Sequence, residues 1–198
     1  MMKGSIAKEK ASNGNALLIV DMISCWDFPD AEKLLPAALR ITPHIAALSA
    51  RCRKARVPVI YANDNQGRWR SDFRALIELS LSCGGSAAKI TRALAPDNED
   101  YFALKPKHSA FMMTPLELLL RHLKVKRLLI AGVASDQCVL VTACEARMRD
   151  LEVIIPRDCV ASQTAARDRA VLRQFEKVHG LATTPGSRLL LVRRRHSA

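Results

Sequence analysis

Short apolar runs alternate with amphipathic segments along this chain. Residues 17–20 are continuously apolar and end at Asp21, which predicts a buried strand. Similar runs predict further strands at 57–61, 101–104, 127–133 and 152–155, and the segments between them have helical spacing. Strands that alternate with helices predict a mostly parallel sheet covered on both faces, a three-layer α/β/α fold of Rossmann-like type.

Apolar residues spaced by three or four positions predict the first helix. Ile41, Ile45, Leu48 and Cys52 fall on one helical face, and Pro43 either kinks this helix or marks its first turn.

Later helices have clear start or stop signals. A helix over 73–81 is predicted to close at Gly84 and Gly85. Thr114 as N-cap, Pro115 at the first position and Glu117 as a capping-box residue predict another helix start. Two more helices are predicted over 136–149 and 164–179.

The length and composition predict one domain. A chain of 198 residues with 49% hydrophobic content can bury one substantial core. Residues 1–15 are polar and predict a flexible tail, 16–180 form the domain, and 181–198 form a basic C-terminal tail. Within that tail, 189–192 could be an appended strand, a partner-binding arm or disordered chain.

Neither a membrane span nor a signal segment is expected. The apolar runs are far shorter than the roughly 20 residues that cross a bilayer. The polar N-terminal segment also lacks an apolar signal core. We therefore expect a cytoplasmic protein with no membrane partner.

The formal net charge of +12 favours anionic partners. Nucleic acid is a weaker expectation, because only 5% of residues are aromatic and no nucleic-acid-binding motif is present. A solvated basic surface and a small-molecule substrate, anionic in one reading, fit the pattern better.

The cysteines and histidines show no metal-binding spacing. The six cysteines form no CxxC pair, and a chain with a good core in a reducing compartment needs no bridges. Most are read as small buried hydrophobic residues, and Cys25, Cys144 and Cys159 are expected to be passive, with no part in the chemistry. The five histidines, His108 among them, are read as structural or surface groups.

Cys138 is the strongest candidate nucleophile. It follows the strand at 127–133 and begins a helix, where backbone NH groups and the helix dipole favour a thiolate. Asp21 and Lys105 also follow apolar strands, so the three groups are expected at one crevice beyond the carboxyl ends of the sheet. They could supply a base, a charge and a nucleophile. Taken alone, a cysteine can equally be a core residue, and an aspartate can equally cap a turn.

Ser135 and Asp136 are read as caps of the helix that carries Cys138.

Four segments carry a family resemblance. LLIVDM at 17–22, ALKPKHSAF at 103–111, AGVASDQCVLVTACEARMRD at 131–150 and VIIPRDCVAS at 153–162 resemble the isochorismatase-like cysteine hydrolases. The resemblance runs from about 16 to 180. It implies a six-stranded, largely parallel sheet and hydrolysis of nicotinamide, carbamoyl compounds or related small amides.

The resemblance also implies roles for particular residues. Asp21, Lys105 and Cys138 would form the catalytic triad of a thioester mechanism. A cis peptide before Ala134 would turn the NH of Ala134, beside that of Cys138, toward the substrate oxyanion. Family members commonly form dimers or tetramers, so a homo-oligomer is expected.

The chain departs from the family pattern in two places. Where the family often has Asp-x-Gln-x-x-Phe, this chain has Asp21, Ile23 and Trp26. Nicotinamidase-like members bind a metal through an aspartate and histidines after the second strand, but 63–67 contain no histidine. We therefore expect no metal and no cofactor. Isochorismatase proper lacks the cysteine, so Cys138 favours an amide substrate.

Substrate-binding residues remain open at this stage. Arg68 and Trp69 either line the pocket, where they could hold an acidic group, or belong to a solvated loop. Trp26 and Phe111 are either pocket walls or core. Two alternatives to amide hydrolysis stay open: hydrolysis of a nonamide bond, and a basic binding protein that retains the fold.

Overall fold

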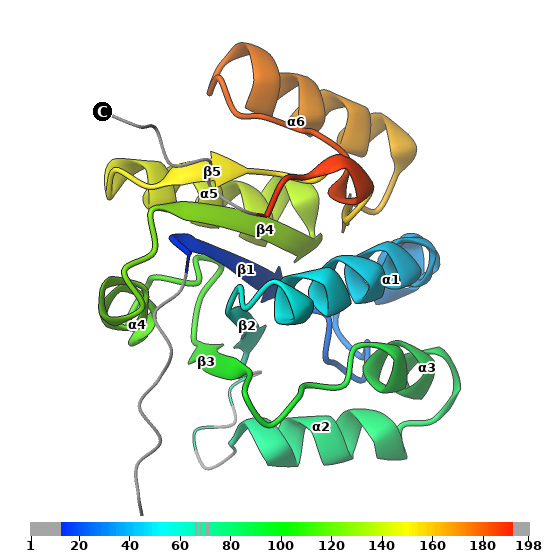
Figure 1. Cartoon of the computed structure of the whole chain (residues 1–198). Helices are drawn as coiled ribbons and strands as arrows, with labels where there is room; N and C mark the ends of the chain where they lie inside the picture. Colours follow the sequence, from blue (N-terminus) through cyan, green and yellow to red (C-terminus); the bar gives the residue numbers. More distant parts are fainter. Residues whose placement is uncertain (1–12, 66, 68, 70–71, 192–198) are drawn as a thin grey trace, which may run out of the picture.

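The computed structural model describes residues 13–65, 67, 69 and 72–191. A parallel sheet runs through its centre and helices lie on both sides (Figure 1). The strands are β1 (Asn15–Val20), β2 (Val59–Asp64), β3 (Tyr101–Lys105), β4 (Arg127–Val133), β5 (Glu152–Ile154) and β6 (Val160–Ala161). Their order is β3-β2-β1-β4-β5, and β6 pairs with the last residues of β4, beyond the reach of β5. The expected six-stranded parallel sheet is confirmed.

Six α-helices and two short helices complete the described chain. They are α1 (Ala31–Lys54), α2 (Phe73–Ser82), α3 (Gly85–Ala93), α4 (Leu116–His122), α5 (Leu140–Met148) and α6 (Ala165–Lys177), with a π-helical turn η1 (Ser135–Val139) and a 3-10 turn η2 (Gly186–Arg188).

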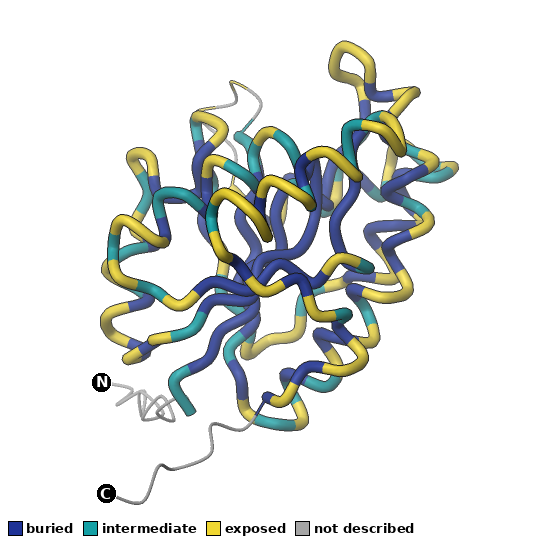
Figure 2. Tube along the Cα trace, turned by 90° about the horizontal axis from the view of Figure 1, so that it is seen from above, coloured by how far each residue is buried: buried dark blue, intermediate teal, exposed yellow. Residues whose placement is uncertain are grey.

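The sheet separates two apolar clusters. Along β1, Leu17 and Ile19 join the cluster packed under α1, α2 and α3, whereas Leu18 and Val20 join the one under α4, α5 and α6. Because successive strand residues point to opposite faces, a continuously apolar strand serves both clusters. Figure 2 shows the buried strands enclosed by helices whose outer sides are exposed. These are the three layers that the alternating pattern predicts.

Helix boundaries differ most from the predictions near glycine and proline. Helix α1 begins at Ala31, so Pro43 lies inside it and not in its first turn. Helix α3 was not predicted, because Gly84 and Gly85 resemble a helix end; Gly85 instead begins α3. At α4 the Thr114 hydroxyl accepts from the NH of Leu116 at 3.2 Å.

The two-residue strand β6 was also absent from the predicted pattern. Its burial is complete, but Val160–Ala161 is too short to give a periodic signal.

The chain after α6 returns to the body of the domain. Ala182 bridges to Ile154, and Leu189 and Leu191 are buried. The Arg51 guanidinium on α1 donates to the carbonyls of Gly186 at 2.5 Å and Leu189 at 2.7 Å. Residues 181–191 therefore pack against α1 and the sheet, while 192–198, like 1–12, lie outside the described residues.

A disulfide joins two loops on the α1 side of the sheet. Cys25, between β1 and α1, is bonded to Cys83, at the end of α2. The prediction that Cys25 is passive and that the chain forms no bridge was wrong. Nothing local signals this pair, because 58 positions separate the two cysteines.

Within the described residues, no helix combines the length and the apolar character that crossing a bilayer would require.

Candidate active site

Three side chains that the sequence predicts to be catalytic meet at the carboxyl edge of the sheet. Asp21 directly follows β1, Lys105 ends β3, and Cys138 lies in η1 just after β4. The chain crosses from β1 to β2 on one side and later returns to β4 on the other, so the edge around β1 is the point where strand order reverses. In an open parallel sheet this is where ligands bind.

Lys105 connects the other two groups. Its Nζ lies 2.8 Å from Asp21 Oδ2 and 3.6 Å from Cys138 Sγ, and it donates to the Lys107 carbonyl at 3.2 Å. Lys105 is fully buried. A buried ammonium is stable only when it is paired and hydrogen-bonded, which these three contacts provide.

The backbone fixes Asp21 in place. Asp21 has a φ of 53°, so the chain leaves β1 in the left-handed region that aspartate tolerates. Its NH donates to the Ala62 carbonyl at 2.9 Å, and its Oδ1 accepts from the NH of Asp64 at 2.8 Å. With Oδ1 held by β2, Oδ2 is the oxygen that pairs with Lys105.

Burial sets the protonation states of the three groups. It raises the pKa of the Cys138 thiol to about 12, and the nearby Asp21 charge adds to this rise while Lys105 opposes it. Burial also raises the pKa of Asp21, against the lowering effect of Lys105. Burial disfavours the Lys105 ammonium, but Asp21 holds the pKa of Lys105 above its ordinary value. Burial thus opposes the thiolate that the start of a helix is predicted to favour, and the Cys138 thiol lies beside a carboxylate that could accept its proton.

The peptide bond between Val133 and Ala134 is cis, as the resemblance implied. Just after it, the NH groups of Gln137 and Val139 both donate to the Ala134 carbonyl, at 3.1 and 3.2 Å. This tight π-helical turn presents Cys138 at the edge of the sheet.

Ser135 and Asp136 do not cap the helix that they precede. The Ser135 hydroxyl donates to Asp168 Oδ1 at 2.7 Å, and Asp136 Oδ2 accepts from Arg167 Nε at 2.5 Å. Asp168 and Arg167 both lie on α6, so these two hydrogen bonds join η1 to α6.

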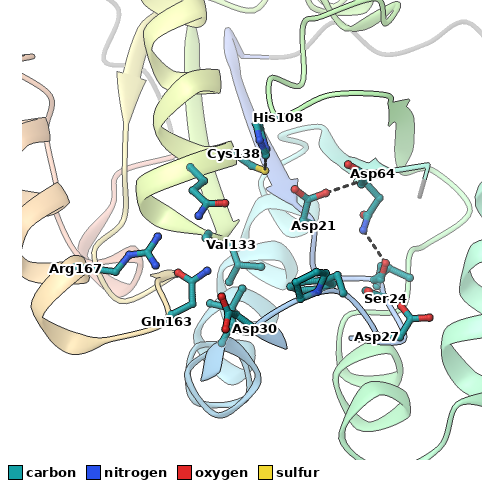
Figure 3. Close-up of a pocket in the computed structure, with 17 residues that line it drawn as sticks. Asp21, Ser24, Asp27, Asp30, Asp64, His108, Val133, Cys138, Gln163 and Arg167 are labelled. Atoms are coloured by element: carbon teal, nitrogen blue, oxygen red, sulfur yellow. Dashed lines mark hydrogen bonds between the residues drawn. The ribbon is translucent and has the colours of Figure 1, made fainter. Parts of the chain in front are cut away.

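A cavity of about 560 Å³ opens beside Asp21 and Cys138. Figure 3 shows Arg167 and Gln163 on the side opposite Asp64, with His108 next to the sulfur. The lining residues are mostly polar: Asp21, Ile23, Ser24, Asp27, Phe28, Pro29, Asp30, Leu34, Asn63, Asp64, His108, Val133, Ala134, Gln137, Cys138, Gln163 and Arg167.

The aromatic residues expected in the pocket lie elsewhere. Trp26 is buried in the cluster under α1, α2 and α3, with its ring centroid 5.9 Å from that of Phe28. Phe111 is buried in the opposite cluster under the Arg149 guanidinium. Trp69 is 79% exposed and lines a separate hollow, and Arg68 lies outside the described residues. Core packing thus accounts for Trp26 and Phe111.

Several lining residues were not predicted. His108, read as structural, has its Nδ1 3.5 Å from Cys138 Sγ. Asp64 is the last residue of β2 and Gln137 precedes Cys138 in the turn after β4, so their positions at strand ends could have suggested them. Gln163 and Arg167 follow the unpredicted β6, and no local pattern marks them.

Metal-ligand chemistry does not fit this site. Asp64 ends β2 but no histidine follows it in the next loop, and no cluster of three or more His, Cys, Asp or Glu side chains suited to a metal occurs among the described residues.

Comparison with known protein families gives one domain match. The model of the isochorismatase domain matches residues 15–185, which include β1 and the η1 turn.

Individual relatives extend over most of the chain. An uncharacterized isochorismatase family protein of Bacillus subtilis (strain 168), YaaI, is 40% identical over 164 residues, covering 82% of this chain and 89% of that protein. Maleamate amidohydrolase of Pseudomonas putida is 24% identical over 177 residues, covering 85% and 82%.

A solved structure has the same architecture. The crystal structure of an isochorismatase family protein from Desulfovibrio vulgaris matches with a TM-score of 0.69 and 25% identity, covering 88% of this chain and 95% of that one.

Proposed function

This chain belongs to the isochorismatase family of hydrolases, and from that premise we propose that it cleaves the C–N bond of a small amide or carbamoyl compound through Asp21, Lys105 and Cys138. One observation carries the proposal. The Lys105 ammonium lies 2.8 Å from the Asp21 carboxylate and 3.6 Å from the Cys138 sulfur, and Asp21 and Cys138 line a cavity of about 560 Å³ that admits a small molecule.

The first half-reaction forms a thioester. Asp21 accepts the Cys138 proton as the sulfur attacks the amide carbonyl carbon, and the carbonyl electron pair moves to the oxygen. The NH groups of Ala134 and Cys138 stabilise that oxyanion. Asp21 then protonates the nitrogen, the C–N bond breaks, and ammonia or an amine leaves.

The second half-reaction returns the enzyme to its starting state. Asp21 removes a proton from water as the water oxygen attacks the thioester carbon. When the C–S bond breaks, the sulfur leaves as thiolate and recovers the proton from Asp21. Lys105 favours the ionised forms of both neighbours in turn, because its ammonium lies between them.

Two features support an amide as substrate. The sulfur nucleophile suits acyl transfer, in which a covalent intermediate divides a difficult displacement into two easier steps. The relative from Pseudomonas putida is named as an amidohydrolase and aligns over 85% of this chain.

The test combines turnover with detection of the intermediate. A panel of small primary amides, ureido acids and carbamoyl compounds is scored for ammonia release by the unaltered protein and by Cys138→Ala. We expect release only with the unaltered protein, together with an acyl adduct on Cys138 in intact-mass spectra of the rapidly quenched reaction. Cys144→Ala is the control, because Cys144 lies outside the cavity.

The same measurements separate amide hydrolysis from cleavage of a nonamide bond. Hydrolysis without an adduct on Cys138, or unchanged ammonia release by Cys138→Ala, would contradict the thioester mechanism.

A further inference from the structure

His108 contacts the reacting sulfur, yet the proposed reaction gives it no role. Its Nδ1 lies 3.5 Å from Cys138 Sγ, and its ring lines the cavity beside the sulfur (Figure 3). A ring nitrogen and a sulfur at this distance are hydrogen-bonded. The contact is therefore made with the atom at which the covalent chemistry would take place.

The backbone on both sides of His108 is held in place. On one side, the Lys107 carbonyl accepts from Lys105 Nζ at 3.2 Å. On the other side, the NH of Ala110 donates to the Thr142 hydroxyl at 3.0 Å, and both of these residues are fully buried. Thr142 lies on α5, the helix that continues the η1 turn. The segment is thus fixed to β3 and α5, and the ring stands beside the sulfur before a substrate arrives.

The surroundings of the sulfur decide the direction of this hydrogen bond. The Cys138 thiol is hydrogen-bonded to Asp21, and Lys105 Nζ donates to the sulfur at 3.6 Å. Because the single thiol hydrogen is directed to the carboxylate, the sulfur accepts from the imidazole. Nδ1 of His108 then carries a hydrogen, as it does both in one neutral tautomer and in the imidazolium.

A donor on the sulfur has its largest effect when the sulfur is charged. Burial raises the pKa of the Cys138 thiol to about 12, so the thiolate is unfavourable in this site. The Lys105 ammonium offsets this only in part, since it lies closer to Asp21, at 2.8 Å. Hydrogen bonds to an ionised group are roughly twice as strong as those between neutral groups. A further N–H on the sulfur therefore stabilises the thiolate more than the thiol.

We propose that His108 is a further catalytic residue, whose Nδ1–H donates to Cys138 Sγ and stabilises the thiolate in both half-reactions. This inference rests on the proposed function. In the first half-reaction the thiol proton passes to Asp21 as the C–S bond forms, and His108 keeps its own proton. In the second, the C–S bond breaks and its electron pair returns to the sulfur. The same N–H then stabilises the thiolate until Asp21 returns the proton.

A matched pair of substitutions isolates this donor. Asparagine and leucine side chains have almost the same shape, but only asparagine carries an N–H that reaches the position of Nδ1. His108→Asn and His108→Leu therefore open the cavity equally and differ in the hydrogen bond to the sulfur. Because His108 is exposed, neither change should unfold the protein, and denaturant midpoints check this.

The first readout needs no substrate. Iodoacetamide alkylates the thiolate, so the rate at constant pH follows the thiolate fraction of Cys138. Every protein compared also carries Cys144→Ala, because Cys144 is partly exposed whereas Cys52 and Cys159 are buried. Mass spectrometry then follows the adduct on Cys138.

We expect the Cys138 thiol of His108→Leu to be alkylated on the order of five-fold more slowly than that of His108→Asn. His44→Leu is the control. His44 is exposed on α1 and does not line the cavity, so this variant should react like its parent.

The second readout is hydrolysis of the amide that the panel shows to be turned over fastest. From His108→Asn to His108→Leu, kcat should fall on the order of five-fold while KM changes less. This split is expected because the N–H acts on the charged sulfur and not on the bound substrate.

Each outcome decides the proposal. Equal or faster alkylation in His108→Leu overturns it, even where an acyl adduct on Cys138 upholds the proposed function. Slower alkylation with an unchanged kcat overturns the catalytic role. If alkylation is slower in His108→Leu but the unaltered protein hydrolyses no amide of the panel, the hydrogen bond to the sulfur stands and the proposed amidase reaction fails.

Discussion

Gly132 lies directly against the backbone of Val20, where β4 and β1 run side by side toward the site. A Cβ built on Gly132 would lie 2.1 Å from the Val20 carbonyl oxygen, and Gly132 has a φ of 114°. Its NH also donates to the Cys159 carbonyl at 2.8 Å. Only glycine fits this position, which precedes the cis peptide of the cysteine turn by one residue.

We therefore expect Gly132→Ala to lower the free energy of unfolding by about 3 kcal/mol or more, because the backbone of β1 or β4 must move. Denaturant unfolding would measure this. Gly180→Ala is the matched control: Gly180 also has a positive φ, 62°, but no atom lies within 4 Å of its added Cβ. It should cost only about 1 to 2 kcal/mol. Equal losses in the two variants would contradict the steric explanation.

Asp21→Asn should make Cys138 more acidic while stopping hydrolysis. The Asp21 charge helps to raise the pKa of Cys138 to about 12, whereas Lys105 lowers it. Without the carboxylate, burial still raises the pKa but Lys105 acts unopposed, so the thiol should titrate at a lower pH. The rate of alkylation of Cys138 by iodoacetamide as a function of pH measures this. Asp27→Asn, which removes a more distant cavity charge, should have a smaller effect. A higher or unchanged Cys138 pKa in Asp21→Asn would argue against the coupling.

The pH dependence of hydrolysis should follow Asp21. Asp21 accepts a proton only when ionised, and its pKa is raised from 3.8. Activity should therefore be lost as the pH falls through a value above 3.8. Since Lys105 lowers the pKa of Asp21, Lys105→Met should move this acidic limb to still higher pH, along with reducing the rate.

Profiles of kcat/KM against pH measure the limb, and carbon NMR of the carboxyl groups follows Asp21 where activity is too low. Lys107→Met is the control, because the Lys107 side chain is exposed and only its carbonyl contacts Lys105. An acidic limb that Lys105→Met leaves in place, or moves to lower pH, would contradict the assigned base.

The sequence predicts the central sheet well because its strands serve two cores at once. Continuous apolar runs such as that of β1 have no amphipathic alternative, so β1 and β4 were placed within two residues of their ends. Local signals failed where they have two physical meanings. Gly84 and Gly85 permit a helix to end, but the same freedom lets the chain turn and begin α3 at once.

The candidate site could be predicted only in part. Asp21, Lys105 and Cys138 each stand at the end of a strand or just after it, and parallel strands bring such positions together. Asp64, the last residue of β2, is placed at the same edge by the same rule, yet no chemical pattern in the sequence distinguishes it. Arg167 lies on α6 and pairs with Asp136 in η1, whereas Gln163 lies between β6 and α6, and no local pattern places either residue at the cavity. Aromatic character leaves Phe111 open between pocket and core, because a large apolar ring suits both, and the structure places it in a core cluster.

The Cys25–Cys83 bridge should stabilise the fold and the cavity wall together. It closes a loop between cysteines 58 positions apart, so its loss should lower the free energy of unfolding by about 2 to 4 kcal/mol. Cys25 also belongs to the loop that carries Asp27 and Phe28 to the cavity, so the KM for any substrate should rise more than kcat falls.

A Cys25→Ser, Cys83→Ser double variant tests both effects. Dithiothreitol should reproduce them in the unaltered protein and should have no such effect on the variant. Cys144→Ser, which leaves the bridge intact, should unfold like the unaltered protein. Identical unfolding midpoints for the oxidised protein and the double variant would show that the bridge contributes nothing to stability.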